Sequence, residues 1–260
     1  MGGETHCWAL ITGSSEGIGY YAAEGLAREG CNVILYARRL ERLQSAAEEI
    51  RREYGVEAVP VRGDLRVRED IDRLMREAYT LTGGTLRVAA LSYGNPECEP
   101  CSLTEAPWES WVEASALYTA STAWILRWLI RAFRGRTVVA AFNSFTIYSP
   151  HPPLVVADTV RRGLPVLLST AARSWPGKIQ AVHVVLGSFR TPGAERTVGR
   201  IAEREGVPFE EYWRSRVEAL SPLGRTGARE DIWALARLLL GLPEYVVYTE
   251  LRLEGGMLPG

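Results

Sequence analysis

Short apolar runs alternate with longer helical patterns along most of this chain, and this alternation limits the possible folds more than any other feature. The runs that have the character of strands are residues 6–11, 32–36, 58–61, 87–91, 137–142, 180–186 and 246–253. They are apolar on both faces, as strands must be in a parallel sheet that helices cover on both sides. The pattern predicts an open, doubly wound α/β fold of the Rossmann type with about seven strands.

A length of 260 residues is compatible with one large domain, and we expect residues 1–260 to form a single Rossmann-type domain. Residues 187–222 break the rhythm of strands and helices, because they are charged and interrupted by glycine and proline. An insert of this length before the last helix predicts a flap over a site. The alternative is a solvated helical hairpin.

The formal net charge of −1 gives no electrostatic reason to expect nucleic acid or an anionic membrane as a partner. The longest apolar stretch, residues 122–133, is interrupted by Arg127 and Arg131. It is shorter than the roughly 20 residues that span a bilayer. The first strand pattern begins too early to leave room for a signal peptide. We therefore expect a cytoplasmic protein with no membrane partner.

Two of the four cysteines, Cys98 and Cys101, form a CxxC motif in a proline-rich loop. A zinc site would need two further ligands, and the three histidines show no paired spacing. This favours a loop dithiol or a local disulfide over a metal site. Cys7 and Cys31 flank strand patterns, and we expect them to be buried small apolar residues.

A glycine-rich turn, "TGSSEGIG" at residues 12–19, follows the first strand and begins the first helix. Glycines at 13, 17 and 19 allow a tight turn and a close approach of the backbone to a pyrophosphate. The helix N-terminus adds free N–H groups and a partial positive charge. The turn therefore predicts a dinucleotide site.

The end of the second strand indicates which dinucleotide would bind there. A carboxylate at this point would bind the ribose hydroxyls of NAD, whereas this chain has Arg38 and Arg39. A guanidinium can hold a 2′-phosphate with two hydrogen bonds. The pattern favours NADP(H) over NAD, with Arg38 in the better position. The alternative is that one of the two arginines is simply solvated.

The glycine turn resembles the cofactor loop of the short-chain dehydrogenase/reductase family, and further motifs follow in the family's order over almost the whole chain. They are "GDL" (63–65), "SYG" (92–94) in place of Asn-Ala-Gly, "RT" (190–191), "SPLGRTGAREDI" (221–232) and "LEGG" (253–256). The general resemblance is to 3-oxoacyl-acyl-carrier-protein reductases. It implies that a dinucleotide contacts Gly13, Ser15, Gly17, Ile18, Gly19, Arg38, Arg39, Asp64, Leu65, Ser92, Gly94, Arg161 and Thr191, with Asp64 at the adenine.

The family's catalytic motif is incomplete in this chain. The resemblance implies a serine after the fifth strand, a tyrosine thirteen residues later that protonates the carbonyl oxygen, and a lysine four residues further on. Ser144 matches the serine, but the same spacing leads to Ala157 and Arg161. The only lysine, Lys178, lies elsewhere, and residues 105–133 lack the family's asparagine. The Tyr-x-x-x-Lys motif is therefore missing.

Arg161 can bind ribose hydroxyls but cannot release a proton, because its pKa exceeds about 12. Pro165 would leave the carbonyl of Arg161 without its usual helical donor and would kink the helix. Tyr148 is our candidate for a replacement proton donor, and Tyr93 and His151 are alternatives. For each of the three, the competing interpretation is packing or a solvated loop position.

Aromatic and aliphatic residues cover most of the circumference of the helical span at residues 108–133. We expect one face of this span to pack on the sheet and another to pack on a partner subunit. The resemblance implies a homodimer or homotetramer built through this helix and the next.

Three functions are compatible with these features. The first is an NADP(H)-dependent oxidoreductase that acts on a ketone or alcohol with a rearranged acid. The second is a pseudoenzyme that binds the dinucleotide as a sensor or subunit partner. The third is a relative with a non-redox reaction, which would require an acidic or nucleophilic cluster under the flap, and the sequence shows no such cluster.

Overall fold

The computed structural model describes residues 7–259 and contains a parallel sheet of seven strands. The strands are β1 (Trp8–Thr12), β2 (Asn32–Ala37), β3 (Ala58–Arg62), β4 (Val88–Leu91), β5 (Thr137–Ser144), β6 (Ile179–Leu186) and β7 (Tyr248–Leu253). Their order across the sheet is β3-β2-β1-β4-β5-β6-β7. The predicted α/β fold is confirmed, with strand ends shifted by one or two residues. The first residue of the first expected strand, His6, lies outside the described residues.

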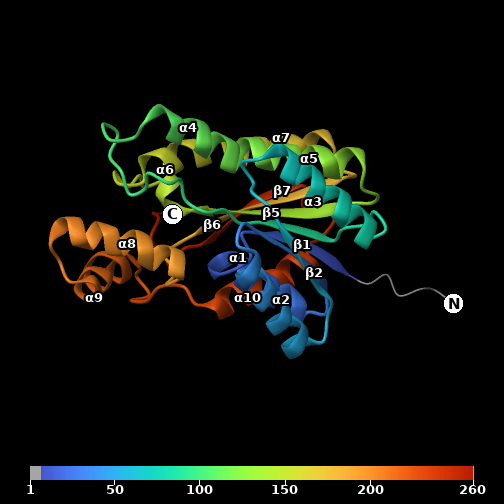
Figure 1. Cartoon of the computed structure of the whole chain (residues 1–260), viewed down its shortest axis with the longest axis horizontal. Helices are drawn as coiled ribbons and strands as arrows, with labels where there is room; N and C mark the ends of the chain where they lie inside the picture. The colour runs from blue at the N-terminus through green and yellow to red at the C-terminus, as the bar shows by residue number, and fades with distance from the viewer. Residues whose placement is uncertain (1–6, 260) are drawn as a thin grey trace.

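Helices cover both faces of the sheet (Figure 1). One face carries α1 (Gly17–Arg28), α2 (Leu40–Tyr54) and α10 (Arg229–Leu240), and the other carries α3 (Arg68–Leu81), α5 (Ser121–Arg131) and α7 (Gly163–Ser174). Each layer of helices buries its own apolar cluster against the strands. Removal of this apolar surface from water is the main stabilising contribution to such a fold.

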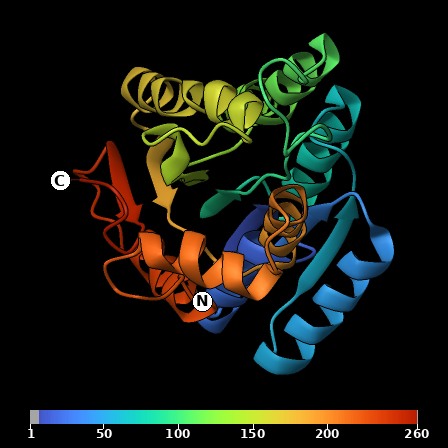
Figure 2. The ribbon, with the colours of Figure 1, turned by 90° about the vertical axis from the view of Figure 1, so that its left-hand side faces the viewer.

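The direction of winding reverses at β1, which lies between β2 and β4. In open parallel sheets, ligands bind at the carboxyl ends of the strands beside such a reversal. The glycine-rich turn follows β1 directly and therefore lies at this point. Figure 2 looks onto the carboxyl edge of the sheet.

The expected helical span at 108–133 consists of α4 (Trp108–Ala114), a π-helical turn η1 (Ser115–Ala120) and α5. Two of its tryptophans form hydrogen bonds with another helix of the same chain. The indole N–H groups of Trp124 and Trp128 donate to Oδ1 of Asp72 on α3 at 2.8 and 2.7 Å. Trp108 remains 76% exposed. Assembly through this span stays a prediction.

The kink expected at Pro165 is confirmed as a break between two helices. Helix α6 (Val155–Arg161) ends four residues before the proline, and α7 begins at Gly163. The carbonyl of Arg161, which loses its helical donor to the proline, accepts a hydrogen bond from Nδ2 of Asn143 at 3.1 Å. The side chain from β5 thus replaces the missing backbone donor.

Residues 187–222 form the helical segment that contains α8 (Pro192–Glu205), α9 (Phe209–Tyr212) and the short turns η3 (Trp213–Val217) and η4 (Glu218–Leu220). The segment has an apolar cluster of its own, which includes Ile201, Tyr212 and Trp213. It lies beyond the carboxyl ends of the strands, across from α4 and α6 (Figures 1 and 2). We refer to it below as the 187–222 segment.

All four cysteines are paired. Cys98 and Cys101 form a local disulfide, one of the two arrangements favoured over metal. The expectation for Cys7 and Cys31 as separate apolar residues is wrong, since the two form a disulfide between the start of β1 and the start of β2. Adjacent parallel strands bring their Cα atoms to 4.5 Å, a closeness that the two flanking positions do not reveal in the sequence.

No helix in the described part of the chain has both the length and the apolar character needed to cross a bilayer.

Candidate active site

A cavity of about 1030 Å³ opens at the carboxyl ends of the strands. Its wall is built by the loops that follow β1, β2, β3, β4, β5 and β6, together with α8 and the turns after α9. The sequence-predicted site residues in this wall are Gly13, Ser15, Gly17, Ile18, Arg38, Arg39, Asp64, Leu65, Ser92, Gly94, Ser144, Arg161 and Thr191. One cavity thus unites residues that are far apart in the chain.

The glycine-rich turn has the backbone geometry that only glycine adopts easily. Gly13 and Gly17 have φ angles of 60° and 65°. A Cβ atom at Gly13 would lie 2.8 Å from the carbonyl oxygen of Ser92. Gly19 lies outside the cavity wall and packs beneath the turn, where a Cβ would overlap the backbone of Gly13. The turn therefore exposes bare backbone at the start of α1.

The two arginines at the end of β2 have different partners. Arg39 forms an ion pair of 2.9 Å with Glu16, and Arg42 and Arg196 contact the same carboxylate. Arg38 is exposed at the cavity wall and has no ion pair or hydrogen bond within residues 7–259. Of these two arginines, Arg38 is thus the one that an incoming anion could engage without breaking an existing pair.

Asp64 follows β3 in the cavity wall, but its carboxylate is already paired with Arg66 at 2.6 Å. Burial raises the pKa of Asp64, and hydrogen bonds from Arg66 outweigh that effect and hold the pKa below its usual range. The same guanidinium also contacts Glu97 and Glu113. The adenine contact that the family resemblance implies for Asp64 would therefore share this carboxylate with Arg66.

Ser144 ends β5 in the cavity wall and belongs to a polar cluster with α6. Its Oγ lies 2.9 Å from the hydroxyl of Thr146, which in turn donates to Oδ1 of Asp158. Arg161 donates to the same carboxylate oxygen at 2.9 Å. Asp158 is 4% exposed, so this pair lies in a low-dielectric environment. The cluster fixes both Ser144 and Arg161.

The structure places Tyr148 away from the chemistry that the sequence suggested for it. The hydroxyl of Tyr148 donates to Glu250 on β7, and its side chain is not part of the cavity wall. The short helical turn η2 (Phe145–Ile147) directs it there. Burial and the bond to Glu250 raise the pKa of Tyr148 to about 12. Both the position and the pKa oppose a role as the proton donor.

The two alternative donors, Tyr93 and His151, both belong to the cavity wall, but neither offers a free and buried donor. The hydroxyl of Tyr93 lies 2.6 Å from Oγ1 of Thr122 on α5, and burial raises its pKa. His151 reaches the cavity wall, but its side chain is exposed and has no hydrogen bond in the described part of the chain. Its backbone N–H donates to Asp158 at 3.2 Å. Neither residue presents a buried, available proton at Ser144.

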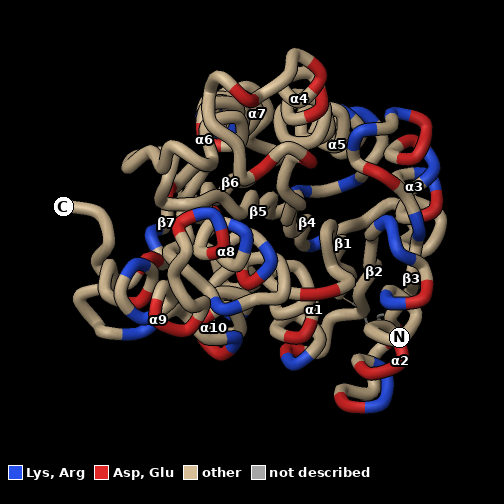
Figure 3. Tube along the Cα trace, turned by 60° about the vertical axis from the view of Figure 1, so that its left-hand side comes forward, with Lys and Arg blue, Asp and Glu red and all other residues tan. Residues whose placement is uncertain are grey.

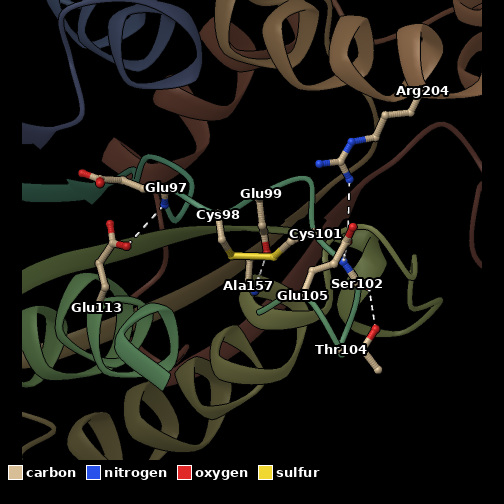
Figure 4. Close-up of a disulfide and its surroundings, with 10 residues drawn as sticks. All are labelled: Glu97, Cys98, Glu99, Cys101, Ser102, Thr104, Glu105, Glu113, Ala157 and Arg204. Atoms are coloured by element: carbon tan, nitrogen blue, oxygen red, sulfur yellow. Dashed lines mark hydrogen bonds and ion pairs between the residues drawn. A yellow bond between two sulfur atoms is a disulfide. The ribbon is translucent and has the colours of Figure 1, made fainter. Parts of the chain in front are cut away.

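Glu99 is an acidic residue of the cavity wall that the sequence reasoning missed. It lies between Cys98 and Cys101, on the loop from β4 to α4, and its side chain is 0% exposed. Oε1 of Glu99 accepts a hydrogen bond of 2.7 Å from the backbone N–H of Ala157 on α6. Figure 4 shows the carboxyl group beside the disulfide and directed toward Ala157. The signal in the sequence was a lone carboxylate inside a CxxC motif.

The 187–222 segment closes one side of the cavity. Thr191 caps α8 by accepting the N–H of Ala194 at 3.2 Å, and it faces the turn at Gly17. Thr197 on α8 accepts a hydrogen bond from Asn95 at 3.1 Å. Figure 3 shows acidic and basic residues intermixed along α8. The segment is helical and lines the cavity, and its role as a flap stays a prediction.

Comparison with known proteins agrees with this architecture. Residues 7–139 match the model of the family described as short chain dehydrogenase. The 3-oxoacyl-(acyl-carrier-protein) reductase FabG of Aquifex aeolicus is 28% identical over 251 residues, which cover 96% of each chain. The very-long-chain 3-oxoacyl-CoA reductase of Anas platyrhynchos is 40% identical over 92 residues, which are 35% of this chain and only 30% of that protein.

A solved structure shows the same fold over almost the whole chain. L-sorbose reductase from Gluconobacter frateurii, complexed with NADPH and L-sorbose, has a TM-score of 0.88 and 25% sequence identity. The similarity covers 98% of this chain and 97% of that chain.

Proposed function

The chain belongs to the short-chain dehydrogenase family, and from that premise we propose that it uses NADP(H) to interconvert a carbonyl compound and an alcohol. The observation that carries the proposal is a single cavity that contains the glycine-rich turn, Arg38 and Ser144. These residues come from three separate loops, so their convergence is a property of the fold.

The residues present fit a dinucleotide. Gly13 and Gly17 have no Cβ atom, which in another residue would take up space in the turn, so their backbone is open to a ligand. The first N–H groups of α1 donate no hydrogen bond to the side chain of the N-cap residue, Glu16. Such groups at a helix N-terminus bind phosphate oxygens well. We assign the pyrophosphate to this turn and the nicotinamide end to the side of the cavity with Ser144.

We assign the 2′-phosphate of NADP(H) to Arg38, and this assignment carries the preference over NAD. The exposed guanidinium of Arg38 is free of partners within residues 7–259, and Arg39 is paired with Glu16. A planar guanidinium suits a phosphate because two N–H groups can bind two oxygens. This supports the expectation that Arg38 is the better candidate of the two.

A reduced nicotinamide bound in the cavity would supply a hydride to the carbonyl carbon of the substrate. The chain's own residues must then hold the carbonyl oxygen and deliver a proton to it. Ser144 Oγ is the hydroxyl that would donate a hydrogen bond to that oxygen, in place of its contact with the hydroxyl of Thr146. Arg161 would supply N–H donors for ribose hydroxyls, while its guanidinium, which is paired with Asp158, keeps its proton.

We propose a 3-oxoacyl compound as the substrate class. The two curated relatives described above are named as 3-oxoacyl reductases. The 187–222 segment also contributes apolar side chains to the cavity wall, including Val198, Ile201 and Val217. Such a wall would favour an acyl chain over a strongly polar substrate.

A second candidate function is dinucleotide binding without turnover, in a sensor or subunit partner. The observation in its favour is the fully buried Ala157 at the position where the family has its tyrosine. The hydroxyls of Tyr93 and Tyr148 are both bound to other groups. This candidate requires the same cofactor cavity but no proton donor in it.

Titration of the purified protein with NADPH and NADH tests the proposal. We expect tighter binding of NADPH, and a loss of roughly 10- to 100-fold for NADPH in Arg38→Ala, because charge-assisted hydrogen bonds contribute about 1.5–3 kcal/mol. NADH binding should change little. Arg42→Ala is the matched control, since Arg42 is a nearby exposed arginine that is paired with Glu16.

Two results would decide between the candidates. Reduction of a 3-oxoacyl thioester with consumption of NADPH would support the oxidoreductase, and tight NADPH binding with no carbonyl reduced would favour the second candidate. Failure to bind either nucleotide would contradict both.

A further inference from the structure

Three arginines stand four residues apart on α8, at positions 196, 200 and 204. Residues with this spacing share one face of a helix. Two of the three are paired with carboxylates on separate loops. Arg196 binds Glu16 beside the glycine-rich turn, and Arg204 lies 3.7 Å from Glu105 on the loop before α4 (Figure 4). This face of α8 is therefore turned toward the loops at the carboxyl ends of the strands.

Arg200, the middle arginine of this row, has no acidic partner. Its side chain is exposed and lines the cavity. Within residues 7–259 its one hydrogen bond is a long contact of 3.4 Å, from Nε to the carbonyl oxygen of Arg196. The two terminal nitrogens of the guanidinium, which carry four N–H groups, are therefore unused.

A second guanidinium in the same wall also lacks a partner. Arg216 on η3 is exposed, lines the cavity and forms no ion pair or hydrogen bond with the described residues. Arg200 and Arg216 directly precede Ile201 and Val217, and these two residues pack in one apolar cluster. The two arginines therefore emerge from adjacent parts of the 187–222 segment.

The exposed and half-buried carboxylates of the cavity wall are engaged elsewhere. Glu16 binds arginines at the start of α2 and on α8, and the acidic residues at positions 64, 97 and 113 are paired with Arg66. The hydroxyl of Tyr212 donates to Glu205, the acidic residue of the 187–222 segment in the wall, at 3.3 Å. The donors of Arg200 and Arg216 thus remain available to a ligand.

We infer that Arg200 and Arg216 bind an anionic group of the substrate, a phosphate or a carboxylate, at the exposed side of the cavity wall. This inference rests on the proposed NADP(H)-dependent function and deepens it, because it requires a charged group in the substrate in addition to the carbonyl. A planar guanidinium donates two parallel hydrogen bonds to either kind of anion. The site is separate from Arg38, which follows β2 and is assigned to the 2′-phosphate.

The experiment measures binding in a complex that cannot react, so that it does not depend on turnover. The full chain is saturated with NADPH and titrated by calorimetry with three 3-hydroxybutanoyl thioesters. Their thiols are pantetheine, which is neutral, pantetheine 4′-phosphate, and pantetheine 4′-succinate, which has a carboxylate. We expect the phosphate thioester to bind about tenfold more tightly than the neutral one, because charge-assisted hydrogen bonds are strong but solvent screens them at an exposed position.

Three variants identify the residues responsible. The double variant Arg200→Gln/Arg216→Gln should bind the three thioesters equally. Arg200→Lys should keep part of the preference, because it keeps the charge but loses the planar pair of donors. Arg214→Gln is the matched control, since Arg214 is an exposed arginine on η3 outside the cavity wall, and it should bind as the wild type does.

A preference for the phosphate thioester that is lost only in the double variant would support the inference with phosphate as the ligand. The same result with the succinate thioester would support it with a carboxylate. Equal binding of all three thioesters by the wild type, or a preference that persists in the double variant, would overturn it and leave the NADP(H)-dependent function intact. Weaker NADPH binding in the double variant would also overturn it, because the arginines would then hold the cofactor.

Two further results would reach beyond the two arginines. A wild type that binds NADPH but none of the thioesters would overturn both this inference and the 3-oxoacyl substrate class. A wild type that binds no NADPH would overturn the proposed function itself.

Discussion

The side-chain amide of Asn143 donates a hydrogen bond of 3.1 Å to the carbonyl oxygen of Arg161. Pro165 lacks the N–H that would serve this carbonyl in a continuous helix. The same amide nitrogen lies 3.0 Å from Nε2 of His183, and the amide oxygen accepts the N–H of Ser144 at 2.8 Å. One side chain on β5 thus holds the helix break beside Arg161 and the backbone of Ser144.

Asn143→Ala should lower the free energy of unfolding by about 1–3 kcal/mol, because it leaves a buried carbonyl and a buried imidazole nitrogen unpaired. Urea denaturation measures the change. Asn95→Ala is the control, since exposed Asn95 makes one bond to Thr197 and should change stability by about 0.5 kcal/mol or less. Equal losses in the two variants would contradict the role of Asn143.

Ala157→Tyr restores the family's residue but should not restore the family's chemistry. Ala157 is 0% exposed and its N–H is bound by Glu99, so the larger side chain should cost about 1–3 kcal/mol of stability by overpacking. The double variant Ala157→Tyr/Glu99→Gly should recover part of that loss. A double-mutant cycle in urea measures the coupling, and strictly additive effects would show that the two side chains do not share the space.

The contribution of Glu99 to stability should fall as pH rises from about 4.5 to 7. The pKa of Glu99 is about 7 in the folded protein against a usual value of 4.5, so the folded state binds more protons in this window. Linkage then lowers the free energy of unfolding with rising pH, by at most about 3 kcal/mol from this group. Urea denaturation at pH 5 and pH 8 measures the change in the free energy of unfolding between the two pH values, and this change should be more negative in the wild type than in Glu99→Gln. The same change in both proteins would be inconsistent with a buried acid at this position.

Removal of the Cys98–Cys101 disulfide should lower the pKa of Glu99. Burial is the main cause of the raised pKa, and the disulfide closes the loop immediately around Glu99. A looser loop in the double variant Cys98→Ser/Cys101→Ser would admit water and stabilise the carboxylate. The infrared C=O band of the protonated Glu99 carboxyl group, which Glu99→Gln identifies, should then titrate at a lower pH. The variant Cys7→Ser/Cys31→Ser is the control, since that disulfide lies at the start of β1 and β2. A carboxyl titration that is the same in both double variants would argue against this link.

The fold could be predicted from the sequence because its main signals are local. Strands that are apolar on both faces imply a parallel sheet, and the glycine spacing at Gly13 and Gly17 implies a turn with positive φ angles, which the structure has. Pro165 likewise predicted the helix break after Arg161. Each of these inferences depends on a few neighbouring residues.

The surroundings of α6 and the direction of Tyr148 could not be predicted in the same way, because they depend on contacts between distant residues. Glu99 and Ala157 are 58 positions apart, and only the packing of the loop on α6 buries the carboxyl group. Tyr148 is close to Ser144 in sequence, yet a three-residue helical turn directs it to Glu250 on β7. Spacing alone cannot give the direction of a side chain that follows such a turn.

Ion pairs with exposed arginines, in addition to apolar contacts, hold α8 against the other loops of the cavity wall. Arg196 binds Glu16 beside the glycine-rich turn, and Arg204 lies 3.7 Å from Glu105 at the other end of the helix. Pairs of this kind weaken as dissolved ions screen them, over a distance of about 8 Å at physiological ionic strength. The contacts that hold α8 against the cavity should therefore weaken as the salt content of the medium rises, whereas the apolar contacts of the same helix should not.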